Sequence, residues 1–139
     1  MLTHDAPILL IDNSAAVRQT VSKALHSAGY ANIHVADSAG EALDKIKTAI
    51  ETEQLYKIIF LDWTLPEEEG LAFLTTCRDE LNLKDAAIIL LTPTTSPQGL
   101  MNAMGSGATS YMTKPLSAET VLRKVEQVGN WVEAQEGDA

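Results

Sequence analysis

The sequence has few of the features that tie a protein to a membrane, to nucleic acid or into a disulfide framework. Its single cysteine, Cys77, excludes an internal disulfide. Ten Lys and Arg face 19 Asp and Glu, and the formal charge of −9 disfavours an electrostatic grip on nucleic acid or anionic lipid. No window approaches the ~18 uninterrupted apolar residues of a membrane span, and no signal segment opens the chain. We therefore expect a cytoplasmic protein whose partners are other proteins.

The chain does contain enough apolar side chain for one hydrophobic core. Its 139 residues are 45% hydrophobic, and that length is too short for two comfortable domains. We expect a single domain over residues 1–139, with its core at about 7–130 and the end of a helix and a tail at 131–139.

Short continuous apolar runs alternate with longer segments of helical spacing. The runs expected to form strands are 7–11, 33–36, 58–61, 86–91 and 109–113. The signals expected at helix boundaries are Gly29, Ser38 with Glu41 in capping-box spacing, Glu67–Glu69 after a turn at Leu65-Pro66, Ser96-Pro97, and Ser117. On the fourth helix, we expect Leu100, Met101 and Met104 to face inward, with the methionines filling the core.

Five strands that alternate with five helices, each strand apolar on both faces, predict an α/β fold with a parallel sheet covered on both sides. In a doubly wound sheet of this kind, the functional crevice lies beyond the carboxyl ends of the strands. Four polar residues stand at these predicted ends: Asp12, Asp62, Thr92 and Lys114. Two carboxylates and an ammonium at one sheet edge form a site suited to phosphoryl chemistry.

Taken singly, each of these residues also fits an ordinary structural role. Asp12 is a good helix N-cap, Thr92 a typical strand-end residue, and Lys114 a typical solvated lysine. Asp62 is harder to explain in this way, because no obvious helix start follows it directly. The joint order of the four residues is what favours a functional site.

Four motifs follow one another along the chain: Leu10-Ile11-Asp12-Asn13-Ser14, Leu61-Asp62-Trp63-Thr64-Leu65-Pro66 with Gly70 following, Leu91-Thr92, and Tyr111-Met112-Thr113-Lys114-Pro115. In this order and spacing, residues from about 8 to about 128 resemble the receiver domain of two-component response regulators. The resemblance implies the flavodoxin-like strand order 2-1-3-4-5. It also implies a signal-transduction phosphoprotein that accepts a phosphoryl group and is not a turnover enzyme.

The resemblance further assigns Asp62 as the phosphoacceptor. It would receive the phosphoryl group from a sensor histidine kinase or a phosphotransfer protein, as an aspartyl phosphate. Asp12, Asn13, Asp62 and the backbone carbonyl of Thr64 would hold Mg²⁺, a hard cation that prefers oxygen ligands.

The remaining motif residues would act on the bound phosphoryl group and on the response to it. Thr92 and Lys114 would stabilise the phosphoryl oxygens. Thr92 and Tyr111 would carry the switch to a face made by the fourth helix, the fifth strand and the last helix, where a downstream protein docks. Lys114-Pro115 is expected to be a cis peptide.

Two residues depart from the family pattern. Asn13 stands where receivers usually carry a second acidic metal ligand, and the missing charge is expected to lower the affinity for Mg²⁺ by about 1–3 kcal/mol. Pro93 follows Thr92, where the family prefers a small residue whose backbone N–H helps to hold the phosphoryl group, and proline has no N–H.

Three functions therefore stay open at this point. The first is a phosphorylatable receiver, and the second is an atypical receiver that keeps the fold as a constitutive protein-binding module. The third is an aspartyl-nucleophile phosphatase of the haloacid dehalogenase type, which Thr64 disfavours, because that class carries an Asp two residues after its nucleophile. Both a stand-alone regulator and one domain of a larger protein fit the sequence. So does a homodimer through the last helices.

Overall fold

The computed structural model describes residues 2–64, 67–93 and 97–137. The strands are β1 (Ile8–Ile11), β2 (Ile33–Ala36), β3 (Ile58–Asp62), β4 (Ala87–Thr92) and β5 (Ser110–Thr113). The helices are α1 (Ala15–Ser27), α2 (Ala39–Glu51), α3 (Glu67–Thr75), α4 (Pro97–Gly105) and α5 (Ala118–Gly137), with a π-helix, η1 (Thr76–Glu80), directly after α3. The expected turn at Leu65-Pro66 and the expected helix start at Ser96 lie outside the described residues.

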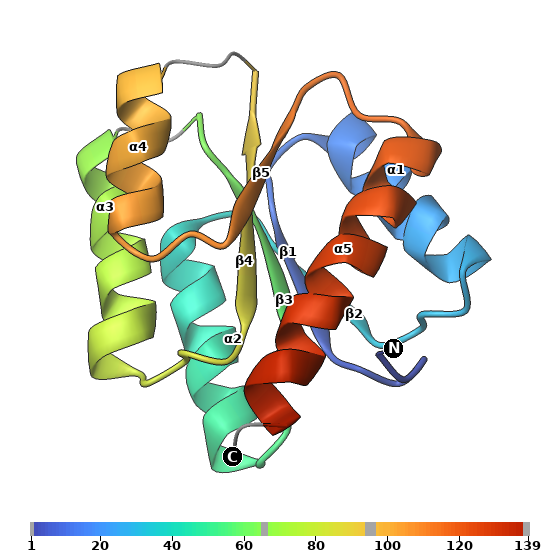
Figure 1. Ribbon diagram of the computed structural model, residues 1–139, viewed down its shortest axis with the longest axis horizontal. Helices are drawn as coiled ribbons and strands as arrows, with labels where there is room; N and C mark the ends of the chain where they lie inside the picture. Colours follow the sequence, from blue (N-terminus) through green and yellow to red (C-terminus); the bar gives the residue numbers. More distant parts are fainter. Residues whose placement is uncertain (1, 65–66, 94–96, 138–139) are drawn as a thin grey trace.

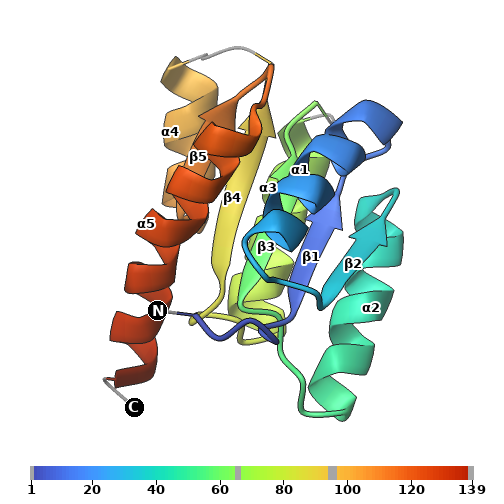
Figure 2. The same ribbon diagram turned by 90° about the vertical axis from the view of Figure 1, so that its right-hand side faces the viewer.

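The strands form one parallel sheet in the order β2-β1-β3-β4-β5, so the predicted fold class and strand order are confirmed. Helices α1 and α5 cover one face of the sheet, and α2, α3 and α4 cover the other (Figures 1 and 2). Strands β1, β3 and β4 are buried along their whole length. Burial on both faces explains why their sequences are continuous apolar runs without alternation.

The hydrophobic core has two halves, one on each side of the sheet. Leu10 and Phe60 point into the half under α1 and α5, whereas their chain neighbours Leu9 and Ile59 point into the half under α2, α3 and α4. Leu2, near the start of the described chain, is buried in the first half, and so is Val132 on α5. The packing therefore extends on both sides of residues 7–130. That residues 1–139 form one domain stays a prediction.

Serine side chains begin two of the helices at the expected positions. The Ser14 Oγ accepts a hydrogen bond from the Val17 N–H at 3.3 Å, and the Ser38 Oγ accepts one from the Glu41 N–H at 3.2 Å. Both satisfy a backbone donor that the first helical turn leaves unpaired. The Ser14 cap matters for function, because it fixes the direction in which the chain leaves β1.

The prediction that Met101 and Met104 face inward is wrong. Met101 is 69% exposed and Met104 is 42% exposed, whereas Ala103 is fully buried and Leu100 packs partly against the core. The small alanine lets α4 approach the sheet closely, and the two methionines are left on the outer side of the helix. Met112 on β5, in contrast, is buried.

The third helix also differs from its expected form. Helix α3 ends at Thr75, and Cys77 lies in η1, where the Leu81 N–H reaches the Thr76 carbonyl at 2.9 Å. Cys77 is fully buried. Burial raises the pKa of its thiol to about 12, so the group stays protonated and unreactive at neutral pH.

A half-buried arginine, Arg78, follows Cys77 and ties the loops at the N-terminal ends of β4 and β5 together. The Arg78 guanidinium donates hydrogen bonds to the carbonyls of Leu83, Ala86 and Gly107 and to the Thr109 Oγ1. These partners satisfy the donors of a charged group that would otherwise be costly to bury. None of the helices in the described ranges is long and apolar enough to cross a membrane.

Candidate functional site

The order of the strands brings four polar residues to one edge of the sheet. Asp12 follows β1, Asp62 ends β3, Thr92 ends β4, and Lys114 follows β5. Strands β1 and β3 are neighbours with Ile11 opposite Leu61, so the two aspartates leave the sheet side by side. Asp12, Asp62 and Thr92 are only 1%, 5% and 4% exposed and are the buried polar residues of the described chain.

Lys114 joins the two carboxylates directly. Its Nζ lies 3.1 Å from Asp12 Oδ2 and 3.2 Å from Asp62 Oδ1. The Lys114 side chain is 18% exposed, so the ammonium reaches the site at the boundary between the interior and solvent. Its backbone N–H donates to the Thr92 carbonyl at 2.7 Å, which continues the pairing of β5 with β4 and aims the lysine at the carboxylates. The peptide bond between Lys114 and Pro115 is cis.

Each carboxylate oxygen of the pair accepts a hydrogen bond. Asp12 Oδ1 accepts from the Ser14 N–H at 2.8 Å, and Lys114 occupies Asp12 Oδ2. Asp62 Oδ1 accepts from Lys114 and from the Thr64 N–H at 3.1 Å, while Asp62 Oδ2 accepts from the Thr64 Oγ1 at 2.8 Å. Both aspartates thus cap the turn that follows their own strand. Asp12 and Asp62 therefore cap these turns and also belong to the cluster around Lys114.

The other residues that the motifs single out lie around this cluster at the surface. Asn13 and Pro93 are exposed, and each directly follows one of the buried polar residues. Tyr111 on β5 is 41% exposed. Of the predicted site residues, Asp12, Asp62, Thr64 and Lys114 are joined by hydrogen bonds, and the Thr92 carbonyl accepts one from the Lys114 N–H.

The donor atoms available here are suited to a hard cation. Two carboxylates, the Asn13 amide oxygen and the Thr64 backbone carbonyl are all oxygen ligands, the kind that Mg²⁺ prefers. In the described ranges no group of three or more His, Cys, Asp and Glu side chains converges to hold a metal. A cation here would therefore depend on two protein charges and on neutral oxygens or water, and it would compete with the Lys114 ammonium for the carboxylates.

Trp63 and Gly70 form a contact that sequence reasoning did not anticipate. A Cβ added at Gly70 would lie 2.5 Å from Trp63 Cζ3, closer than real atoms approach. The Trp63 indole therefore packs directly on the α3 backbone. The backbone N–H of Trp63 donates a hydrogen bond to the Leu91 carbonyl at 2.8 Å. The motif therefore needs a glycine at position 70, because a side chain there would collide with the Trp63 ring.

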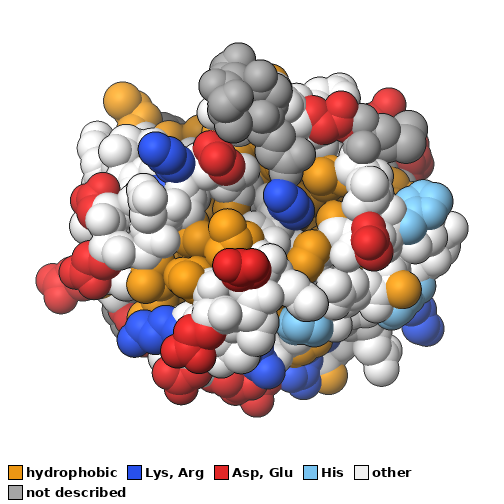
Figure 3. Space-filling view, turned by 90° about the horizontal axis from the view of Figure 1, so that it is seen from below, with side chains coloured by type: hydrophobic (Ala, Val, Ile, Leu, Met, Phe, Trp, Pro, Cys, Tyr) orange, Lys and Arg blue, Asp and Glu red, His pale blue; other side chains and the backbone are white. Residues whose placement is uncertain are grey.

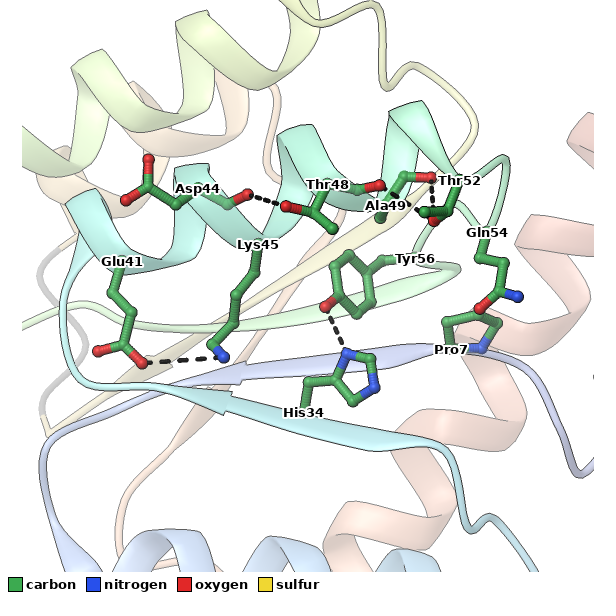
Figure 4. A pocket seen from close by; sticks show the side chains of 10 residues that line it. All are labelled: Pro7, His34, Glu41, Asp44, Lys45, Thr48, Ala49, Thr52, Gln54 and Tyr56. Carbon is green, nitrogen blue, oxygen red and sulfur yellow. Dashed lines mark hydrogen bonds and ion pairs between the residues drawn. The ribbon is translucent and has the colours of Figure 1, made fainter.

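A separate hollow of about 530 Å³ lies between α2 and β2 and contains none of the residues above (Figure 4). Its floor is formed by His34 and Tyr56, whose rings meet edge to face and whose Nδ1 and hydroxyl share a hydrogen bond of 2.6 Å. The Thr48 and Thr52 hydroxyls at its wall donate to backbone carbonyls of α2. Its charged side chains, Glu41, Asp44 and Lys45, are not buried, so we assign the chemistry to the buried carboxylate cluster.

The end of the molecule opposite the carboxylates shows a mixed surface. Seen from there, acidic and basic side chains are interspersed around a central group of apolar ones (Figure 3). This face offers no large area of positive charge among the described residues.

The fold and the site define this chain as a doubly wound α/β protein with two buried aspartates and a lysine at the carboxyl ends of its strands. Residues 8–126 match the family model described as the response regulator receiver domain, so the chain belongs to that family. It is 26% identical over 121 residues to chemotaxis protein CheY1 of Helicobacter pylori, covering 87% of this chain and 94% of that protein. It is 24% identical over 128 residues to chemotaxis protein CheY-3 of Vibrio cholerae, covering 92% and 95%.

Solved structures agree with this assignment. The chain is similar to chemotaxis response regulator CheY4 of Vibrio cholerae, with a TM-score of 0.77, 32% identity, and coverage of 89% of this chain and 98% of that chain. Receiver domains are generally phosphoacceptors and not turnover enzymes, and Mg²⁺ binding at the phosphorylation site is typical of the family.

Proposed function

We propose that this protein accepts a phosphoryl group on Asp62 from a phosphohistidine of a sensor histidine kinase or a phosphotransfer protein. The observation that carries the proposal is the contact of one ammonium, Lys114, with both buried carboxylates. Lone aspartates that merely cap turns do not need such a cation, whereas a carboxylate that attacks an anionic phosphoryl group does.

In the proposed reaction, an Asp62 oxygen forms a bond to phosphorus while the bond from phosphorus to the donor imidazole nitrogen breaks. The electron pair of that bond stays with the imidazole, which takes up a proton, and the product is a mixed anhydride. Lys114 places its positive charge on one phosphoryl oxygen, and the Thr92 hydroxyl donates to another. Mg²⁺, when bound, neutralises the negative charge on the reacting oxygens. Asp12, Asn13, Asp62 and the Thr64 carbonyl would hold that ion.

The output is proposed to be a protein contact on the face of α4, β5 and α5. Met101, Met104 and Tyr111 leave large apolar side chains exposed there, and a hollow of about 270 Å³ beside Tyr111 is lined by Pro115, Arg123 and Lys124. Exposed apolar groups next to polar ones are typical of protein docking sites. Thr92 and Tyr111 would pass the change at Asp62 to this face.

A second candidate is a constitutive binding module with the same fold. It is favoured by Asn13, which removes one charge from the metal site, and by Pro93, which offers no N–H to a phosphoryl group. The two candidates differ in whether Asp62 reacts at all.

The test is to incubate the purified protein with acetyl phosphate and Mg²⁺ and to measure its intact mass. We expect a gain of one phosphoryl group that Asp62→Asn abolishes. Asp44→Asn, which changes an exposed aspartate on α2, is the matched control and should keep the gain. No gain in the wild type at millimolar Mg²⁺ overturns the phosphoacceptor proposal and leaves the binding module.

A further inference from the structure

The two oxygens of Asp62 are not equally available, and one side chain makes the difference. Oδ1 accepts from the Lys114 ammonium and from the Thr64 backbone N–H, so both of its lone pairs are directed at donors. Oδ2 accepts from the Thr64 hydroxyl at 2.8 Å. Oδ2 is therefore the oxygen with a lone pair left for a new bond.

The Thr64 hydroxyl occupies a site on this oxygen with its hydrogen bond. Asp62 is 5% exposed, whereas Thr64 is an exposed residue in the turn that leaves the sheet edge. The hydroxyl is carried by a single rotatable bond, so it can leave Oδ2 without any movement of the backbone. The Thr64 N–H, in contrast, is fixed by the turn itself.

We propose that Thr64 is a positioning residue that restrains Asp62 in the resting protein, because its hydroxyl holds the oxygen that attacks phosphorus. This inference rests on the proposed function of Asp62. A hydrogen bond to an ionised carboxylate stabilises the charge that the reaction consumes, so it lowers the nucleophilicity of Oδ2 as well as blocking it. The bond must break before attack, and its energy adds to the barrier of the transfer.

Thr64→Val tests the effect of the hydroxyl without changing the size of the side chain. The variant keeps the shape and the backbone carbonyl of Thr64, and it cannot donate to Oδ2. We expect it to be phosphorylated by acetyl phosphate about three- to tenfold faster than the wild type, less than the full value of a hydrogen bond to a charged group, because water can replace the lost donor. Thr64→Ser keeps the hydroxyl and should react within about twofold of the wild type, whereas Thr64→Ala, which removes both groups, should react at least as fast as Thr64→Val.

Thr48→Val is the matched control, because its hydroxyl donates to a backbone carbonyl of α2 away from the carboxylates. A Thr64→Val rate equal to or below that of the wild type overturns the proposal.

A second measurement separates failure of this proposal from failure of the phosphoacceptor role. Mg²⁺ is titrated without a phosphodonor, and the fluorescence of Trp63 is followed in a Trp131→Phe background. Release of Oδ2 should lower the dissociation constant of Mg²⁺ several-fold in Thr64→Val. If neither protein is phosphorylated, the phosphoacceptor role fails, and an unchanged dissociation constant then overturns the restraint by Thr64 as well.

Discussion

Lys114→Met removes the positive charge between two buried carboxylates and should change both stability and Mg²⁺ binding. Each ion pair, at 3.1 and 3.2 Å, has a Coulomb energy of about 5 kcal/mol at an effective dielectric of about 20, an upper limit before desolvation is subtracted. Breaking a buried pair typically costs about 3–5 kcal/mol, because the remaining charge stays buried without compensation. The partial exposure of Lys114 lets water screen the carboxylates, so we expect a loss of about 2–3 kcal/mol.

The assay is urea unfolding followed by circular dichroism, in EDTA and in Mg²⁺. With a slope of about 1–3 kcal/mol per molar urea, the loss lowers the midpoint by about 0.7–3 M in EDTA. Mg²⁺ at about 100 times its dissociation constant stabilises the folded state by about 2.7 kcal/mol and should restore the variant almost fully. The variant should also bind Mg²⁺ about tenfold more tightly than the wild type, because the ion no longer displaces an ammonium.

Lys47→Met is the matched control for loss of one positive charge, since Lys47 is exposed on α2. It should leave both the midpoint and the effect of Mg²⁺ unchanged. An equal midpoint for Lys114→Met and the wild type in EDTA, or an equal gain from Mg²⁺, would show that the lysine does not balance these carboxylates.

Two further variants test the surroundings of the cluster. Asn13→Asp supplies the second acidic residue of the family pattern and should tighten Mg²⁺ binding about tenfold to a hundredfold, read from Trp63 fluorescence. Asn130→Asp on α5 is its control, and equal affinities in the two would refute the charge argument. Gly70→Ala places a methyl group against the Trp63 ring and should cost about 1–2 kcal/mol of stability despite the better helix propensity of alanine, with a shift in Trp63 emission. A more stable variant with unshifted emission would mean that the ring moves aside freely.

The sheet was predictable because its signal is local and redundant. Strands such as Ile8–Ile11 and Ile58–Asp62 are buried on both faces, so every residue in the run contributes to the pattern. The meeting of Asp12 with Asp62 and Lys114 was predictable for a different reason. Parallel strands place their carboxyl ends at one edge, and the resemblance supplied the order in which the strands lie there.

The prediction for α4 was wrong because hydrophobicity indicates the cost of exposing a side chain but not the direction in which it points. On α4, the inward face is marked by Ala103, a residue too small to stand out, and the conspicuous Met101 and Met104 lie outside. The π-helical turn at Cys77 adds a residue to a pattern that regular periodicity cannot describe. The hydrogen bond from the Thr64 hydroxyl to Asp62 depends on side-chain geometry, for which the sequence has no signal.

The balance of charge in the pocket connects the departures from the family pattern to function. Asp12, Asp62 and Lys114 carry two negative charges and one positive charge, which leaves one net negative charge where an aspartate at position 13 would leave two. Lys114 already contacts both carboxylates, so it balances half of their negative charge in the resting site. The incoming phosphoryl group brings further negative charge, and Lys114 alone cannot balance it while it remains bound to both aspartates. In the proposed reaction, the lysine would therefore turn from the carboxylates to the phosphoryl oxygens, and a bound cation would supply the positive charge that the carboxylates lose.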